Sequence, residues 1–312
     1  LGLSKDIPVS QFPAKLVLEL RSLTRKYYDL TDERSAHINK LKGDLHTVFP
    51  QYLDVFCDVT GKTSTMILRQ YGTPDKILRG HKKTMIEKIS KASRKGLAKA
   101  SERYEKLCAA ANAAKTFGCQ IDSIYFNIFL TLDLVEKLDS ALDSILNRIR
   151  QLITFNKNEK FIQQIKLLNT IPGVGFLTAV TIMCEIGDFS AFRNPKQLFA
   201  YFGLDPEVNE SGKFVGTQLH RSKRGSRIAR RAIFAVALAS IRTKRNGEGI
   251  NPYLRKYYEL KSGQKPKMVA IGAVMHKVCN IVFAVLRDEK AFELRSPEEH
   301  CKQYQRPALA AA

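Results

Sequence analysis

Acidic residues are scarce in this chain of 312 residues: Asp and Glu number 30, against 51 Lys and Arg. The formal net charge is therefore +21 at pH 7, and the sequence pI is about 9.8. An excess of one sign this large repels itself, and proteins usually keep it for a polyanionic partner. Nucleic acid is the commonest such partner, and an anionic membrane surface is the competing one. The 44% of hydrophobic residues still suffice for a buried core, which argues against general disorder.

Long apolar runs and a leader are also lacking. The run from Ala232 to Ile241 is too short for the roughly 18 apolar residues of a spanning helix. The first residues have neither the basic region nor the apolar region of a signal peptide. We therefore expect a cytoplasmic protein with no membrane partner.

Paired cysteines are absent as well. The six cysteines form no Cys-x-x-Cys pair, so neither a zinc ribbon nor a disulfide framework is expected. His276 and Cys279 share one helix face, but they lie in an apolar run with no second ligand pair. A core position is therefore favoured over a metal site for these two residues.

Helical periodicity dominates the chain. Apolar residues recur at three- and four-residue steps from Pro13 to His46, which predicts one long amphipathic helix. Thr73 and Pro74 supply an N-cap and a first-turn proline, so another helix should begin there. The stretch 81–106 should be helical, and it is strongly basic. Its cations are Lys82, Lys83, Lys88, Lys91, Arg94, Lys95, Lys99, Arg103 and Lys106.

A further helical run is predicted from Ile121 to Leu168. Its apolar stripe includes heptad steps, so the segment either self-associates as a coiled coil or pairs with another helix of the same chain. Both alternatives stay open. Residues 213–220 are the only segment that is predicted to be extended. A βαβ pattern is absent, so the predicted fold class is mainly α.

The length suggests about two domains at roughly 150 residues each. Glycine and proline cluster after Asn169, and we place a boundary near residue 165. Residues 1–165 would form a linker and long-helix region, residues 166–295 a second helical domain, and residues 296–312 a tail.

The first motif with chemical meaning is IPGVGFLTAVTIM, residues 171–183. Two helices joined by a Gly-x-Gly turn are typical of a helix-hairpin-helix. Gly173 and Gly175 can take positive φ and would let backbone amides approach a phosphate. The N-terminus of the next helix adds partial positive charge. A tight turn between two core helices is the alternative, and phosphate contact is favoured.

The second motif is ESGK, which places Ser211 two residues before Lys213. A serine attacks a phosphodiester only if its proton is removed and the charge of the phosphate is neutralised. Lys213 and the arginines that follow can supply the neutralisation. Taken by itself, however, a Ser-Gly pair is usually only a turn.

The third motif is RSKRGSRIARR, residues 221–231, which contains no acid. Gly225 and Ser226 should form the entry and the N-cap of a helix. Cations near a helix N-terminus oppose its dipole, so an anionic ligand is favoured over a merely solvated basic face. The cations are Arg221, Lys223, Arg224, Arg227, Arg230 and Arg231.

In this order and spacing, the three motifs resemble the C-terminal domain of the insertion-sequence family 110 transposases, also called DEDD or Piv-like transposases. The similar stretch runs nearly continuously from Leu168 to Glu293. The helix LELRSLTRKYYDLTDERSAHINKLKGDL also resembles the segment that follows the family's N-terminal catalytic domain. The resemblance therefore covers most of the chain.

The resemblance implies long coiled-coil helices followed by a helical transposase domain with a helix-hairpin-helix. It implies a DNA transposase or recombinase whose serine nucleophile is Ser211 here. Family members also carry an N-terminal RuvC-like domain with four acidic residues that bind Mg²⁺, and at least some are directed by an RNA encoded in the element. DNA, such an RNA and further copies of the chain are the implied partners.

One part of the family pattern has no counterpart here. The RuvC-like domain should precede the helix at Pro13, where the acidic quartet does not fit. Asp29 and Asp32 imitate its last pair but are expected to be solvated helix acids that bind no metal. We therefore expect a truncated transposase that is inactive alone. The competing interpretations are a non-catalytic helix-hairpin-helix protein and a basic protein that coats nucleic acid or a membrane.

Overall fold

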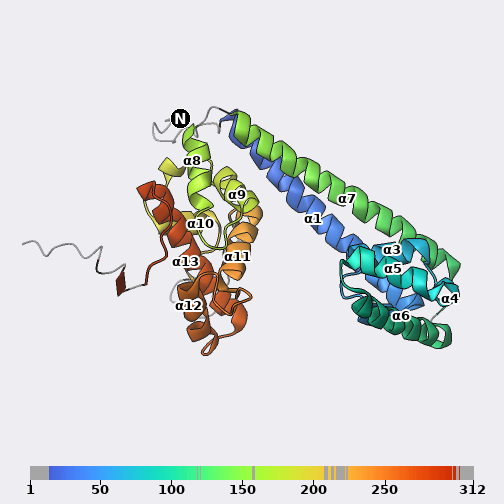
Figure 1. Ribbon diagram of the computed structural model, residues 1–312. Helices are drawn as coiled ribbons and strands as arrows, with labels where there is room; N and C mark the ends of the chain where they lie inside the picture. The colour runs from blue at the N-terminus through green and yellow to red at the C-terminus, as the bar shows by residue number, and fades with distance from the viewer. Residues whose placement is uncertain are drawn as a thin grey trace, which may run out of the picture. The chain divides into compact units, whose positions relative to one another are not determined.

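The computed structural model of the chain describes residues 14–117, 119, 121–156, 159–206, 210–211, 214–215, 222, 224–296, 298–299 and 302. Its contacts group into two compact units. Unit 1 comprises Leu1–Lys26 and Leu146–Ala312, and unit 2 comprises Tyr27–Ile145. Helices make up nearly all the regular structure described in both units, which confirms the predicted mainly α fold class (Figure 1).

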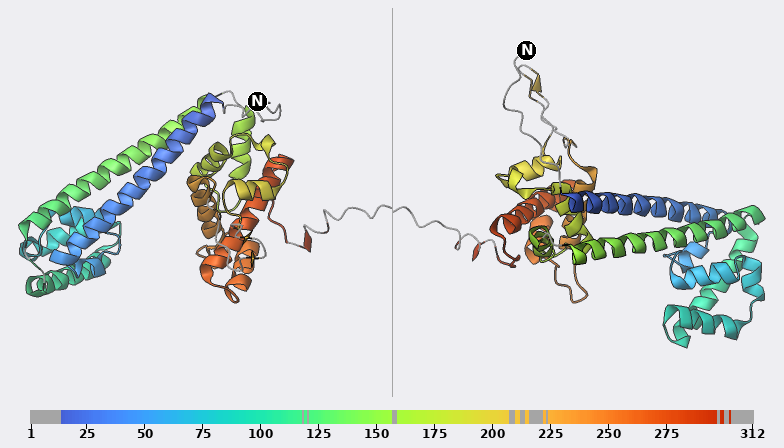
Figure 2. Two further views of the ribbon diagram at one scale, coloured as in Figure 1. Left: turned by 180° about the vertical axis from the view of Figure 1, so that it is seen from behind. Right: turned by 90° about the horizontal axis from the view of Figure 1, so that it is seen from above.

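Unit 2 contains two long helices that run antiparallel, as both views in Figure 2 show. They are the parts of α1 (Lys15–Val48) and α7 (Asp122–Phe155) that belong to this unit. Arg34 of α1 holds Asp139 of α7 in a bidentate ion pair, with nitrogen–oxygen distances of 2.5 and 3.1 Å. The long amphipathic helix predicted from Pro13 to His46 is confirmed as α1.

The predicted apolar stripe of α7 packs within unit 2. Of its members there, Ile128, Val135 and Leu142 are buried, and Leu138 is half-buried. Of the two alternatives for this stripe, the structure therefore shows pairing inside the chain. A different row on α7, one helical turn between members, is exposed: Phe126 by 61%, Leu130 by 46% and Leu134 by 43%.

Five shorter helices between α1 and α7 complete unit 2. They are α2 (Tyr52–Val55), α3 (Lys62–Gln70), α4 (Pro74–Arg79), α5 (Lys82–Ser93) and α6 (Leu97–Phe117). The predicted start of α4 is confirmed, because the Thr73 hydroxyl accepts a hydrogen bond from the Lys76 amide.

The helical character predicted for residues 81–106 is confirmed in α5 and α6, with a turn between the two helices. Arg94 has a left-handed φ of 53° and ends α5. The Ser90 hydroxyl donates to the carbonyl of Lys95 at 2.7 Å and stabilises the turn. Gly96 follows at once, and glycine disfavours continuation of a helix.

The helices of unit 1 surround one apolar core. In chain order its elements after α7 are α8 (Glu159–Leu168), α9 (Phe176–Ile186), the 3-10 turn η1 (Phe189–Ala191), α10 (Pro195–Tyr201), β1 (Glu210–Ser211), β2 (Phe214–Val215), α11 (Arg227–Ile241), α12 (Pro252–Ser262) and α13 (Lys267–Asp288). α13 packs on α8, α10, α11 and α12, and α9 packs on α8 and α11. Buried alanines on α11, among them Ala229, Ala232 and Ala237, allow its neighbours to approach closely.

The prediction of one helical run over residues 121–168 needs a correction, since α7 and α8 are separate helices. Asn156 lies outside both, and asparagine favours turns over helix interiors. The predicted boundary near residue 165 falls within α8 and stays a prediction. β2 lies in the stretch 213–220 that was expected to be extended, and it pairs with β1 in an antiparallel hairpin.

α13 corrects the expectation that no helix approaches the length of a membrane span. It has 22 residues with a most apolar window of mean hydropathy 2.0, which is enough by length and composition alone. In unit 1, however, 56% of that window is buried, and Val274, Val278 and Cys279 are almost inaccessible. The ring of His276 packs edge-on against Phe199 at 4.7 Å. The protein core therefore accounts for the apolar composition of this helix.

Candidate nucleic-acid interface

The positive charge is concentrated in one unit. Unit 1 contains 33 Lys and Arg against 15 Asp and Glu, whereas unit 2 contains 18 against 15. The formal net charges are thus +18 and +3. A polyanion is therefore attracted mainly to unit 1.

The Gly-x-Gly turn joins α8 to α9, and its two glycines differ. Gly173 has a φ of +96°, as predicted, and a Cβ there would lie 2.7 Å from the Ser240 hydroxyl oxygen. Close packing against α11 therefore requires this glycine. Gly175 is the N-cap of α9 with a φ of −87°, so the predicted positive φ is wrong at this position. It is exposed, and no atom crowds its Cβ position.

The glycine turn and the basic motif lie at opposite ends of α11. The Ser240 hydroxyl, near the C-terminal end of α11, donates to the carbonyl of Pro172 in the turn at 3.0 Å. Ser226 lies at the N-terminal end of α11, as the N-cap of this helix. Fifteen helical residues separate the two ends, which is roughly 22 Å. The glycine turn and the basic motif therefore lie apart within unit 1.

Two glycines bring the chain before α11 against the end of α10. A Cβ on Gly225 would lie 2.0 Å from the carbonyl oxygen of Tyr201 and 2.6 Å from the amide of Gly203. Gly203 has a φ of +64°, and a Cβ there would lie 2.5 Å from the amide of Gly225. Only glycine at both positions allows two backbones to pass this close.

Asp205 and Ser222 close the same junction. The Ser222 amide donates to the Asp205 carbonyl at 2.9 Å, and its hydroxyl lies 2.6 Å from the Asp205 carboxylate. Asp205 and Ser222, which flank the segment 206–221 with β1 and β2, are therefore held together by these two hydrogen bonds. Ser211 pairs with Phe214 in this hairpin. The side chain of Ser211 and the whole of Lys213 lie outside the described residues.

The predicted start of α11 is confirmed, since the Ser226 hydroxyl accepts from the Ala229 amide at 3.1 Å. Of the cations around it, Arg224 and Arg227 are exposed. Arg230 is half-buried and donates to the carbonyls of Phe202 at 3.2 Å and Gly225 at 2.7 Å.

The cations of this motif therefore divide by what they contact. Arg224 and Arg227 are exposed to solvent, whereas Arg230 donates to backbone carbonyls at the junction between α10 and α11. Arg231 is partly buried. Arg221 and Lys223, the remaining predicted contacts, lie outside the described residues.

Glu185, which pattern reasoning missed, is the buried acid beneath this end of α11. Its side chain is 2% exposed and accepts two hydrogen bonds from Arg25 of α1, at 2.8 and 2.9 Å. Burial acts to raise its pKa, but hydrogen bonds from Arg25 and Ser226 and the nearby guanidinium charges outweigh burial, so the pKa lies below its ordinary value. The lowered pKa favours the charged carboxylate, which Arg25 holds in place. A lone acid within the apolar run VTIMCEIG was the signal available in the sequence.

A cationic hairpin beside the glycine turn was missed as well. Residues 242–250 fold back through a bridge between Thr243 and Gly249, and the Ile250 amide donates to the carbonyl of Arg242 at 2.8 Å. Arg242 and Arg245 are exposed there. The dipeptide Asn246–Gly247 after consecutive basic residues is the hairpin signal that could have revealed it.

No metal centre is evident in the part of the chain that the structure describes. It contains no cluster of three or more His, Cys, Asp and Glu residues that could hold an ion. Asp29 and Asp32 are exposed on α1. The described residues therefore do not fit the acidic Mg²⁺ site of the complete family enzyme.

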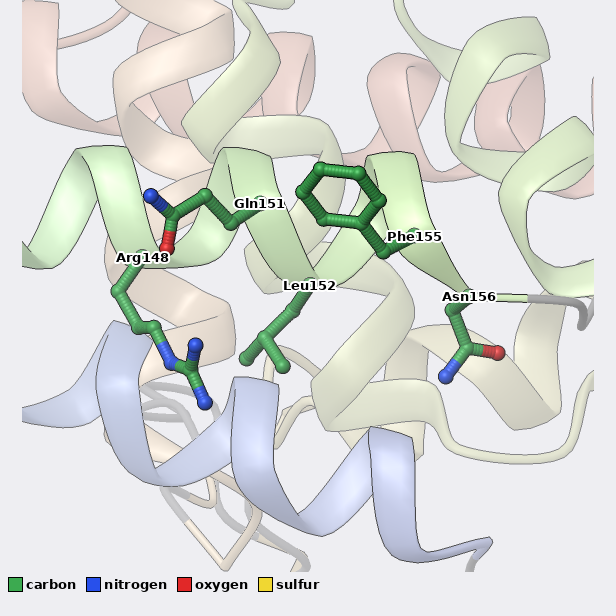
Figure 3. A pocket seen from close by; sticks show the side chains of 5 residues that line it. All are labelled: Arg148, Gln151, Leu152, Phe155 and Asn156. Atoms are coloured by element: carbon green, nitrogen blue, oxygen red, sulfur yellow. The ribbon is translucent and has the colours of Figure 1, made fainter.

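The C-terminal end of α7 lines a hollow of about 380 Å³ in unit 1. Figure 3 shows Arg148 and Leu152 pointing to one side of the helix and Phe155 to another. Phe155 is 83% exposed. The hollow presents one cation and no nucleophile or acid, so we assign it no chemistry.

This arrangement is that of a cationic, helical domain. Residues 165–259 match the sequence profile described as the Transposase IS116/IS110/IS902 family. This stretch, from the end of α8 into α12, therefore belongs to that transposase family.

Similar proteins agree with this assignment. An insertion element IS110 protein of Streptomyces coelicolor is 23% identical over 91% of this chain and 66% of its own length. The pilin gene-inverting protein of Moraxella bovis is 30% identical over 56% of this chain and 52% of its own. The transposase for insertion sequence element IS1111A of Coxiella burnetii is 26% identical over 58% and 50%. The chain thus spans between half and two thirds of the length of these relatives.

Proposed function

We propose that the protein is a DNA transposase or recombinase of an insertion sequence, acting in the cytoplasm. The observation that carries this proposal is the group of cations at the N-terminal end of α11, inside the stretch that matches the transposase family. Arg224 and Arg227 are exposed there, at the helix end where the dipole disfavours cations. A DNA phosphate would interact favourably with both arginines and with the positive end of the helix dipole.

We propose Ser211 as the nucleophile. Its oxygen would attack a backbone phosphorus, and the bond from that phosphorus to a deoxyribose oxygen would break. The serine proton leaves and the departing oxygen gains a proton, so one phosphodiester replaces another and the step is reversible. The clamp between Asp205 and Ser222 supports this role, because it fixes both ends of the segment that contains Ser211.

Activation of Ser211 is the part of the proposal that depends on the complete protein. In the family, Mg²⁺ would stabilise charge that builds up on the phosphate. The described residues supply no carboxylate cluster for it. We therefore propose that the 312-residue chain binds DNA but does not cut it alone. An RNA partner would direct the choice of the DNA target.

DNA binding should depend on Arg224 and Arg227 and fall steeply with salt. We expect R224Q/R227Q to weaken binding to duplex DNA about tenfold and to flatten the salt dependence by up to two phosphate contacts, because neutralised phosphates release counterions. Fluorescence anisotropy with a labelled duplex at several salt concentrations measures both quantities.

A matched variant separates binding from folding. Arg230→Met removes one neighbouring charge but also two hydrogen bonds to partly buried carbonyls, so it should lower the unfolding free energy by about 1–3 kcal/mol. R224Q/R227Q should leave stability nearly unchanged. Wild-type affinity that stays flat with salt would overturn the proposed interface.

We also propose that the protein works as a homo-oligomer, through the exposed row of Phe126, Leu130 and Leu134 on α7. Charged substitutions in this row, L130E/L134E, should convert an oligomer into a monomer at micromolar concentration, because they bring charge into an apolar contact. Analytical ultracentrifugation measures the change. Leu142→Glu is unsuitable as a test because Leu142 is buried inside unit 2. A wild-type protein that is monomeric at these concentrations contradicts the proposal.

A further inference from the structure

Unit 2 segregates its charges although its net charge is small. Residues 82–106 hold nine Lys and Arg against three Glu, whereas residues 122–145 on α7 hold one Lys against five Asp and Glu. The basic group lies outside the stretch that matches the transposase family. Neither the Ser211 segment nor the N-terminal end of α11 accounts for it.

Four of these cations line one hollow of about 320 Å³ at the junction of α5 and α6. They are Lys95, Lys99, Arg103 and Lys106. Lys106 pairs with Glu102 at 2.8 Å, and the Arg103 guanidinium lies 5.6 Å from the centre of the Phe56 ring. Lys95 and Lys99, together with Lys91 on α5, are exposed and form no ion pair within the described part of the chain.

The spacing of these cations suits a regular polyanion. On α6, Lys99, Arg103 and Lys106 follow at steps of four and three residues. Seven residues at helical rise extend over roughly 10 Å. One strand of a duplex presents about three phosphates over that length, at roughly 3.4 Å of axial rise each.

The polarity of the surface favours a duplex over a single strand. Proteins that bind single strands stack bases on exposed aromatic rings. Here the nearby rings are engaged: Phe56 is buried beneath Arg103, and Tyr104 lies 5.9 Å from the Lys82 ammonium. What remains exposed is charge, which contacts a backbone.

We propose that the surface formed by Lys91, Lys95 and Lys99 is a second DNA-binding site, which contacts the phosphate backbone of a duplex independently of unit 1. The identity of the polymer as DNA rests on the proposed function; the surface itself rests on the charges of unit 2. It would hold a second stretch of DNA, or a flanking part of the same one, without reading its sequence.

The test compares two triple variants of the full 312-residue chain. K91Q/K95Q/K99Q removes the surface, and K40Q/K42Q/K137Q removes the same charge from exposed positions elsewhere in unit 2. We expect the first to weaken duplex binding about tenfold or more at about 0.1 M salt and to flatten the salt dependence by two to three contacts. The second should change affinity less than about twofold.

Equal losses in the two variants would overturn the proposal, because they would reflect net charge alone. A loss confined to an RNA hairpin, with duplex DNA unaffected, would overturn the choice of DNA. R224Q/R227Q, measured in parallel, reports separately on unit 1. If that variant binds like the wild type while K91Q/K95Q/K99Q does not, the interface proposed in unit 1 fails and this one stands. Melting curves that match the wild type show that each triple variant is folded.

Discussion

Gly225→Ala is expected to lower the unfolding free energy of unit 1 by about 3 kcal/mol, at the upper end for an overpacked site. Its Cβ would lie 2.0 Å from the carbonyl oxygen of Tyr201. The atoms that this Cβ would crowd, the Tyr201 carbonyl oxygen and the Gly203 amide nitrogen, both belong to the backbone. No side chain can therefore rotate away, and the junction between α10 and α11 must open. Since Arg224 and Ser226 flank this glycine, duplex binding should fall together with stability. Chemical denaturation and anisotropy on the same protein measure the two effects.

Gly175→Ala is the matched control. It also replaces a glycine of unit 1 that directly precedes a helix, but nothing lies within 4 Å of the new Cβ. Its φ of −87° suits alanine, so the change should stay within about 1 kcal/mol. If Gly225→Ala is as stable as Gly175→Ala, the two backbones do not approach as closely as described.

Local signals in the sequence predicted the elements well. Thr73 and Ser226 both cap helices, because a short side-chain oxygen before a helix satisfies an otherwise unpaired amide. The long apolar period predicted α1. The turn at Arg94 was missed, since arginine seldom adopts positive φ and only the hydroxyl of Ser90 and the following glycine reveal it.

Contacts distant in the chain were beyond those signals. Gly173 looked like a phosphate-binding glycine, yet the residue that demands it is Ser240. Glu185 forms an ion pair with Arg25, which is 160 residues away in the sequence, and no periodicity links the two. The basic motif likewise looked uniform in sequence. Packing alone distinguishes Arg230, which binds backbone carbonyls, from the exposed Arg224.

Ser211→Ala should abolish covalent attachment to DNA, by about three orders of magnitude or more, in a protein that carries both halves of the family's machinery. An unassisted serine is a weak nucleophile at neutral pH because little of it is ionised. The 312-residue chain alone should therefore form no adduct. Fusing a RuvC-like domain with its acidic residues ahead of residue 1 should restore one. The assay is a denaturing gel of labelled DNA with Mg²⁺ present.

Ser222→Ala supplies the contrasting variant, because Ser222 is the serine at the base of the same segment. It bonds to Asp205, so its loss should reduce adduct yield modestly through a looser clamp and should not abolish it. An adduct that survives Ser211→Ala but disappears in Ser222→Ala would reassign the nucleophile. An adduct formed by the unfused chain would show that the activating groups lie within these 312 residues. A fused protein that binds DNA and never forms an adduct would favour the non-catalytic helix-hairpin-helix interpretation, since a binding protein has no use for Ser211.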